Sequence, residues 1–447
     1  MDTEKLQMPG MCPPALSYDI WHLITSILWE NGEGPDRRDL LPLSSTCKVL
    51  RQWIAPRIFR CIRLHNTVKS GAAVRAISQG SMKDYVKELR YMGTVSPAND
   101  NDRSLEEVYP PEVNAVLSNL ASFPNLERLH ISFPYDGHGT WDEIWEDFGN
   151  EFIDDAEAVA EAETEFSWRG MMAASYRAIA SNYAPDRCPN GTDHLPLSIE
   201  IKELPMYAVS TFTSLHWPHF ISQLTSFTLS FPRMDNGAGW NLNKHLGYYG
   251  FVENLPFWFF DHLRRVEHFE FDPAVSGILG EMGETGIFQA SAPKIRSVKF
   301  TNHAICAELQ DFLVRHMATL ERISLYHCHA TSTEPATPWA EFLEALFNAS
   351  PPRLREFELV HEDGESKEEI LGFNSHWADK ELVEQAKAKI RNEPGAEAFP
   401  YVYLSDKYGF RGNMEDDAMT RFLEGGDDRA YKRLMEVVRK NRDLPIL

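Results

Sequence analysis

The hexapeptide LERISL, at residues 320–325, has apolar residues at its first, fourth and sixth positions and polar residues between them. The alternation of Ile323 and Leu325 with polar neighbours is typical of a β-strand with one buried and one exposed face. LREFEL, at 354–359, repeats the pattern, and a helical stretch, WAEFLEALFNAS at 339–350, lies between the two copies. The sequence therefore predicts a recurring unit of one strand and one helix.

The same phrase returns along most of the chain. Its other copies are FRCIRL at 59–64, VKELRY at 86–91, LERLHI at 126–131, LTSFTL at 224–229, VEHFEF at 266–271 and IRSVKF at 295–300, with LPLSIEI at 195–201 as a degenerate copy. The late intervals, roughly 25 to 34 residues, fall within or just beyond the range of leucine-rich repeats. Stacked in parallel, such strands bury one face and leave alternate residues on a concave surface. Unrelated strands in an ordinary α/β domain are the alternative.

The N-terminal part of the chain follows a helical pattern instead. LSYDIWHLITSILWE, from Leu16, has apolar residues at spacings of three and four, and NGEGPDRR then breaks the helix. A second helical segment lies between residues 40 and 56. Two or three short amphipathic helices cannot bury all their leucines alone, so they either cap the following array or offer their apolar stripe to a partner.

We therefore expect an α/β protein in four parts. The parts are a flexible tail at 1–15, a helical domain at 16–64, an irregular leucine-rich-repeat-like solenoid with a parallel sheet and outer helices at 65–365, and a C-terminal helical segment at 366–447. An insertion at 141–165 is rich in acids and has no Lys or Arg, so it is either a solvated face or a docking surface for a basic partner. Gly425-Gly426 followed by Asp427-Asp428 predicts a helix end and a new N-cap.

Composition limits the classes of partner. The formal net charge is −22 and no dense Lys/Arg run occurs, so neither nucleic acid nor a membrane is an expected partner. The most apolar later stretch, FVENLPFWFFDHL at 251–263, is too short to cross a bilayer. Six scattered cysteines without a Cys-x-x-Cys pair, and an N-terminus without a signal peptide, indicate a cytoplasmic or nuclear protein with reduced thiols.

No motif with catalytic mechanics occurs in the sequence, so we expect no catalytic residues, cofactor or metal. YHCHA, at 326–330, places His327, Cys328 and His329 together, but strand alternation predicts that the two histidines share one face and that Cys328 lies on the other. An unrecognised hydrolase or transferase remains a third hypothesis, and it requires a nucleophile and a base brought together from distant residues.

Residues 16–64 resemble an F-box, the short helical domain that binds the Skp adaptor of cullin-based ubiquitin ligases. The match runs through LSYDIWHLITSIL, DRRDLLPLSSTCKVLRQW and IAPRIFRCIRL, although Ser17 stands where F-boxes commonly have Pro. The order of a helical box followed by irregular leucine-rich strands looks like F-box proteins of filamentous fungi. The resemblance implies an adaptor-binding set comprising Leu16, Asp19, Ile20, Ile24, Leu40, Leu43, Cys47, Lys48 and Leu50.

The resemblance leads to a first hypothesis, a non-catalytic substrate-receptor subunit of an SCF-type ligase that binds the Skp adaptor, through it a cullin, and an unknown target protein. Alternation along the strands selects a target-binding set comprising Arg128, His130, His268, Glu270, Lys299, Arg322, Ser324, Glu356 and Glu358. The alternative is an interaction scaffold outside any ligase, in which the N-terminal helices cap the array.

Overall fold

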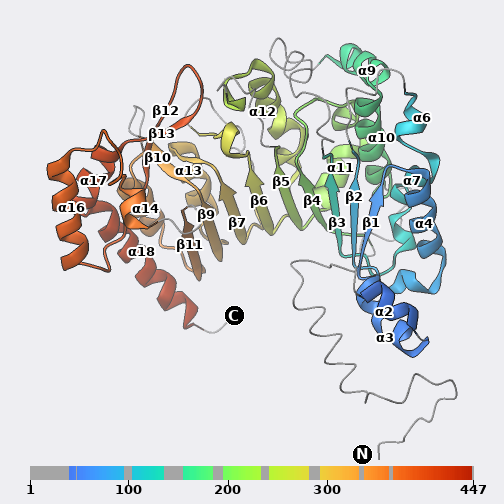
Figure 1. The fold of residues 1–447 in the computed structure, drawn as a ribbon, viewed down its shortest axis with the longest axis horizontal. Helices are drawn as coiled ribbons and strands as arrows, with labels where there is room; N and C mark the ends of the chain where they lie inside the picture. Colours follow the sequence, from blue (N-terminus) through green and yellow to red (C-terminus); the bar gives the residue numbers. More distant parts are fainter. Residues whose placement is uncertain are drawn as a thin grey trace, which may run out of the picture.

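The computed structural model describes residues 40–46, 48–94, 103–134, 155–184, 195–232, 241–280, 292–331, 337–361 and 366–444. Within these ranges the fold is α/β, and its centre is a parallel sheet of nine strands whose order in space is their order in the chain (Figure 1). The strands are β1 Cys61–His65, β2 Glu88–Met92, β3 Arg128–Ser132, β4 Ser198–Lys202, β5 Ser226–Ser230, β6 His268–Asp272, β7 Ser297–Thr301, β9 Arg322–Tyr326 and β11 Glu356–Val360.

Each copy of the repeated phrase, including the degenerate one, forms one strand of this sheet, as predicted. In the eight regular copies the strand begins two residues after the phrase does. The first apolar residue therefore precedes the strand, and Val86, Leu224 and Leu354, for example, are fully buried in the hydrophobic core. The phrase thus specifies the entry to the strand as well as its alternation.

The core side of the sheet consists of two rows of apolar residues, because neighbouring strands pair in a single register. The second strand positions are Ile62, Leu89, Leu129, Ile199, Phe227, Phe269, Val298, Ile323 and Phe357, and the fourth are Leu64, Tyr91, Ile131, Ile201, Leu229, Phe271, Phe300, Leu325 and Leu359. All are buried except the half-buried Leu359 at the edge. Phenylalanines dominate the middle, where Phe227 and Phe269 stack with centroids 6.4 Å apart.

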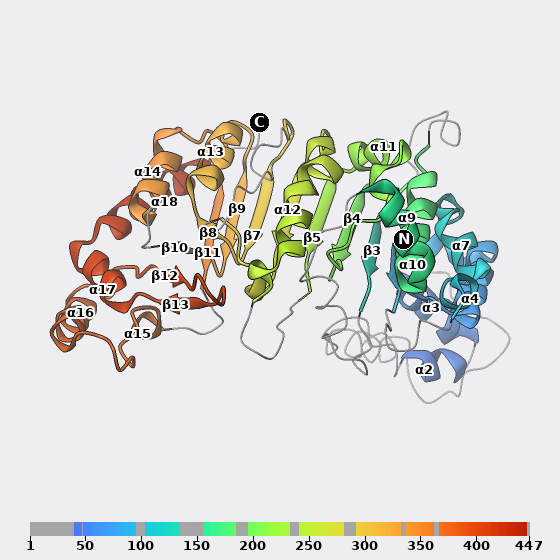
Figure 2. The same ribbon diagram turned by 90° about the horizontal axis from the view of Figure 1, so that it is seen from above.

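Helices cover the core side of the sheet, and Figure 2 shows several of them, such as α11, α13 and α14, along one side of the row of strands. The α-helices described between the first and last strands of the sheet are α4 Val68–Gln79, α6 Leu105–Val108, α7 Pro111–Leu117, α9 Ala156–Glu165, α10 Ser167–Ser181, α11 His216–Gln223, α12 Leu246–Trp258, α13 Ala307–His316 and α14 Trp339–Asn348. Short 3-10 helices are η1 Ser81–Tyr85, η2 Leu120–Ser122, η3 Ser210–Thr213, η4 Leu242–Lys244, η5 Phe260–His262 and η6 Val275–Gly277. Contacts between α4 and α7, α7 and α10, and α10 and α11 make this layer continuous from α4 to α11, and α13 packs on α14.

A second, smaller sheet follows the late strands. Its order is β13 Arg411–Asn413, β12 Tyr401–Leu404, β10 His329–Thr331 and β8 Ala304–Ile305, and only the β12–β13 pair is antiparallel. The chain turns into β8 and β10 through Asn302 and His327, whose φ values are +56° and +51°. The turn at His327 interrupts strand alternation, so the expected sharing of one face by His327 and His329 is wrong. Helix α13 begins at Ala307, two residues after β8 ends.

The C-terminal segment packs on the end of the array. It contains α15 Lys367–Ile370, α16 Lys380–Asn392, α17 Glu415–Glu424 and α18 Gly426–Arg442, together with β12 and β13. Helix α18 packs along α14, and its Leu434 and Val438 belong to the same hydrophobic core as the sheet. The segment is therefore helical only in part, and it closes the core at the β11 end.

The Gly-Gly-Asp-Asp sequence ends one helix and starts the next, but its aspartates do not cap the second. Gly425, at φ +69°, terminates α17 and has no side chain with which to cap α18. The buried carboxylate of Asp427 instead accepts hydrogen bonds from the Ala340 amide of α14, at 2.8 Å, and from the Tyr401 hydroxyl of β12, at 3.0 Å. Asp427 thus links α18 to α14 and to β12. Buried donors need an acceptor, and this carboxylate supplies one to both the Ala340 amide and the Tyr401 hydroxyl.

The N-terminal helices α2 Leu40–Thr46 and α3 Lys48–Ile58 pack on each other below β1 in Figure 1. Leu50, Ile54 and Ile58 of α3 form a small core cluster that is separate from the main core. Pro56 lies inside α3, whose last residue is Ile58. The expected tail at 1–15 and the first expected helix lie outside the described residues.

Candidate functional site

The first, third and fifth residues of the strands point away from the core and form what we name the open face. All nine residues of the predicted target-binding set lie on it. Arg128, His268, Arg322 and Glu356 occupy first positions of their strands, and His130, Glu270, Lys299, Ser324 and Glu358 occupy third positions. The face therefore brings together residues that are up to 230 positions apart in the sequence (358 minus 128). Most are exposed or half-buried, but Ser324 is buried.

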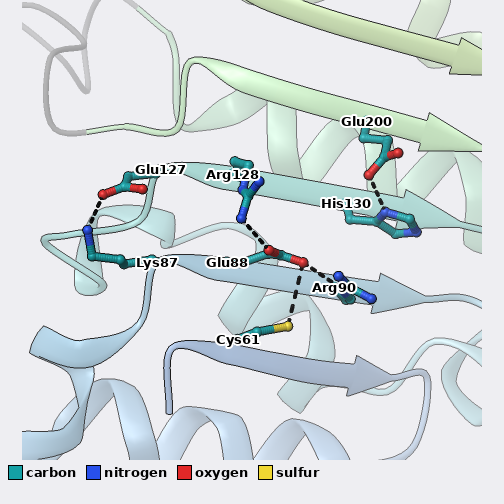
Figure 3. A network of polar contacts seen from close by, with 8 residues as sticks. All are labelled: Cys61, Lys87, Glu88, Arg90, Glu127, Arg128, His130 and Glu200. Carbon is teal, nitrogen blue, oxygen red and sulfur yellow. Dashed lines mark hydrogen bonds and ion pairs between the residues drawn. The ribbon is translucent and has the colours of Figure 1, made fainter. Parts of the chain in front are cut away.

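At the N-terminal end of the open face, one carboxylate serves two guanidinium groups (Figure 3). Glu88 of β2 accepts from Arg128 Nη2 of β3, at 2.9 Å, and from Nε of Arg90 on its own strand. Partial burial acts to raise the pKa of Glu88, but the hydrogen bond from Arg90 and the charges of both arginines outweigh it and hold the pKa below its usual value. Glu88 therefore stays ionised and holds both arginines in place.

The adjacent strand carries a second network around Glu200 (Figure 3). His130 Nδ1 lies 2.7 Å from Glu200 Oε2, and Lys202 Nζ lies 2.7 Å from Glu200 Oε1. Burial acts to raise the pKa of Glu200, but the hydrogen bonds and charges of His130 and Lys202 lower it to about 2. This carboxylate is charged at any physiological pH, so it fixes the orientation of the His130 ring.

Three polar pairs occupy the C-terminal half of the open face. Lys299 Nζ lies 2.7 Å from Glu270 Oε1 and 4.6 Å from the centroid of the Tyr326 ring. Arg322 pairs with Glu356 across β9 and β11. Ser324 Oγ donates to Glu358 Oε2 at 3.2 Å, which explains why its hydroxyl is withdrawn from solvent. Six of the nine predicted target residues thus pair with one another.

Charge is unevenly distributed along the face, in a chain whose net charge is −22. Strands β1–β3 carry Arg63, Arg90 and Arg128 with Glu88, β5 carries only Ser226, Thr228 and Ser230, and β6–β11 carry Lys299 and Arg322 with Glu270, Asp272, Glu356 and Glu358. The first group sums to +2 (three minus one) and the last to −2 (two minus four). Within the part of the chain that the structure describes, Arg63 makes no ion pair. The open face therefore has a positive electrostatic potential at its β1–β3 end and a negative one at its β6–β11 end, a pattern that would orient a docking protein.

Arg63 and Arg90, the two arginines at adjacent registered positions, are absent from the target-binding set predicted from the sequence. The same alternation, applied to FRCIRL and VKELRY, selects both of them. Glu200 and Thr228 follow in the same way from LPLSIEI and LTSFTL.

The predicted adaptor-binding residues lie only partly within the described chain. Leu16, Asp19, Ile20, Ile24 and Cys47 lie outside it. Leu40 is the first residue of α2, Leu43 packs half-buried against the α3 cluster, Lys48 is exposed and Leu50 is buried in the cluster. The described helices therefore share one small core, and their role toward an adaptor remains a prediction.

Cysteine and metal chemistry find little support in the described ranges. Burial raises the pKa of the Cys306 and Cys328 thiols to about 12, so both are protonated at neutral pH. Among the residues placed by the structure, no group of three His, Cys, Asp or Glu side chains is arranged to hold a metal ion. None of the helices seen there has the length and apolar character needed to cross a membrane.

Comparison of the chain with protein-family models and with curated proteins yields no match. The function proposed below is therefore inferred from the residues, from the geometry above and from the resemblance of residues 16–64.

Proposed function

We propose that this protein is a substrate-receptor subunit of an SCF-type ubiquitin ligase. Residues 16–64 act as the F-box that binds the Skp adaptor, and through it a cullin. The following array is an irregular leucine-rich-repeat-type solenoid whose open face binds a target protein. Ubiquitin transfer is catalysed by other subunits, and this chain contributes proximity and orientation of the target.

The observation that carries the proposal is the separate core of α2 and α3. Leu50, Ile54 and Ile58 are buried among themselves and against Leu43 and Trp53, and they are not part of the core that extends from β1 to α18. A helical unit with its own small core, attached at one end of a long sheet, suits a module that docks to a partner while the sheet stays free.

The open face supports the second half of the proposal. It presents charged and hydroxyl side chains from nine parallel strands, and many of its charges are already held by neighbours. Preorganised polar groups lose little entropy on binding, and their charge pattern contributes specificity for a partner.

Co-purification of the chain with a Skp adaptor tests the proposal. We expect a stable complex with the wild type and at least a tenfold loss of adaptor affinity in an Ile20→Asp, Leu43→Asp double variant. The matched control is a Thr228→Asp, Lys299→Asp double variant, which places the same side chains on the open face and should retain the adaptor. A folded wild-type chain that does not bind the adaptor would refute the proposal.

One observation favours an interaction scaffold as the second candidate. Phe59 packs against both core clusters, and α3 touches η1 of the array, as a cap would. In that case the Leu43→Asp variant lowers the thermal stability of the whole array, whereas in a docking module it changes adaptor binding far more than array stability.

A further inference from the structure

A partly enclosed cavity of about 130 Å³ lies between α9, the segment leading into η3, and α12. Its apolar wall includes Val159 of α9, Val209, and Phe257 and Trp258 of α12. Val159, Val209 and Trp258 are buried, whereas Phe257 is 59% exposed at the opening. In Figure 1 both helices lie above the sheet, whereas α2 and α3 lie below it. The cavity is thus separate from the open face and from the N-terminal helices.

Hydrogen bonds hold the segments that line this cavity in place, and these bonds occupy polar groups of the lining segments. Glu163 of α9 accepts from the Ser210 amide at 2.5 Å and from its hydroxyl at 2.7 Å. Trp217 Nε1 donates to the Trp258 carbonyl at 2.8 Å, and Arg169 donates to the Ala208 carbonyl at 3.0 Å. The cavity is therefore preformed, which lowers the entropic cost of filling it.

The surroundings of the cavity are acidic. Helix α9 carries Glu157, Glu161, Glu163 and Glu165, α12 carries Glu253, and neither helix contains Lys or Arg. All except Glu163 are exposed. Among the described residues next to the cavity, Arg177 of α10 donates to Ser210 Oγ at 3.2 Å. The exposed glutamates give the solvent side of these two helices a negative field, which attracts a cationic partner over about 8 Å at physiological salt.

We infer that this cavity takes one apolar side chain of a basic segment of another protein. Its volume is well below the roughly 300 Å³ from which small-molecule pockets begin, and close to that of an engineered cavity of about 150 Å³ that binds benzene. It therefore fits one Leu-, Met- or Phe-sized anchor. Flanking lysines or arginines of the same segment meet the exposed glutamates of α9 and α12, so apolar burial gives affinity and charge gives selectivity.

Fluorescence anisotropy with the full chain tests this inference. The probe is a fluorescein-labelled peptide of about 13 residues with one central Phe between two Lys-rich flanks. One comparison peptide has Ser in place of Phe, and another has Glu in place of each Lys. We expect the Phe–Lys peptide to bind at least tenfold more tightly than either comparison peptide.

Two variants of α9 localise the binding. Ala156 lines the cavity and is exposed, so Ala156→Trp fills the opening, whereas Ala160 is exposed on the same helix and does not line it. We expect Ala156→Trp to lower the affinity for the Phe–Lys peptide at least tenfold. Ala160→Trp should change this affinity less than twofold. If Ala156→Trp does not fold, Phe257→Ser replaces it. Equal binding of the Phe and Ser peptides, an unaffected cavity variant, or no binding to the folded wild type would overturn the inference.

Discussion

Glu88 and Arg128 face each other across β2 and β3, with 2.9 Å between Oε2 and Nη2, and the same carboxylate also accepts from Arg90. One strand away, Arg63 is in register with Arg90. A single anion thus stabilises two neighbouring cations at one end of the open face, and a third cation, Arg63, lies beside them.

Replacement of Glu88 by Gln should expose the repulsion among these arginines. Its side chain is 12% exposed, so the lost charge is poorly compensated by water. We expect the free energy of unfolding to fall by about 1 kcal/mol at low salt, and to recover in part at high salt, since like charges are then screened. Urea unfolding at two salt concentrations measures this. Glu127→Gln, in an exposed pair with Lys87, is the control and should change stability by less than about 0.5 kcal/mol.

Glu200 should make the folded chain sensitive to acid. Its pKa is about 2 in the folded state against a usual value of 4.5, so the unfolded chain binds the proton first as pH falls. Its stabilising contribution is complete above about pH 5 and declines toward pH 2. Glu200→Gln should lose less unfolding free energy than the wild type between about pH 5 and pH 3. An identical slope in the two proteins would show that the network around Glu200 does not stabilise the fold.

Two buried histidines should destabilise the protein at mildly acid pH. Burial lowers the pKa of His303 and of His329 to about 3, so each stays neutral in the folded chain while it becomes protonated in the unfolded chain below a pKa near 6.5. Stability therefore falls with pH below that value, by up to about 1.4 kcal/mol per pH unit for each histidine. Chemical denaturation between about pH 7 and pH 5 should show this slope, and His329→Gln should reduce it. The exposed His216 provides the control, His216→Gln, which should leave the slope unchanged.

Asp427 should couple the C-terminal helices to the array. Asp427→Ala leaves the Ala340 amide and the buried Tyr401 hydroxyl without their acceptor, at an expected cost of about 1–3 kcal/mol. A double-mutant cycle with Tyr401→Phe should give a coupling energy above about 0.5 kcal/mol. Asp443, exposed at the other end of α18, offers the control Asp443→Ala, which should be close to neutral. Additive effects of the Asp427 and Tyr401 changes would contradict the assigned link.

The strands of the large sheet could be predicted from the sequence because their signal is local. Burial of Ile323 and Leu325 follows from alternation within one hexapeptide, and the same holds even for Ile199 and Ile201 in the degenerate copy. Membership of the open face follows from the same rule. The pairing of Glu88 with both Arg90 and Arg128 does not follow from alternation. It depends on the register between β2 and β3 and on side-chain geometry, and a short stretch of sequence encodes neither.

The second sheet and the α9–α12 cavity could not be predicted either. Strand β8 has two residues and β10 three, too few for a period, and each follows a left-handed residue that only the folded backbone reveals. Val159 and Phe257, which face one cavity, lie 98 positions apart (257 minus 159). The acidic insertion was visible in the sequence, but the apolar cavity beside its helix was not.

The strand order has a mechanical consequence. Every strand of the large sheet pairs only with neighbours that precede or follow it in the series, and no strand is inserted between two distant ones. A force applied to the C-terminus would therefore detach the C-terminal segment first, from α18 back to α15, and would then separate β11, β9 and β7 from the large sheet in turn. Such a molecule unfolds sequentially from its C-terminal end under load, and its N-terminal helices would unfold last.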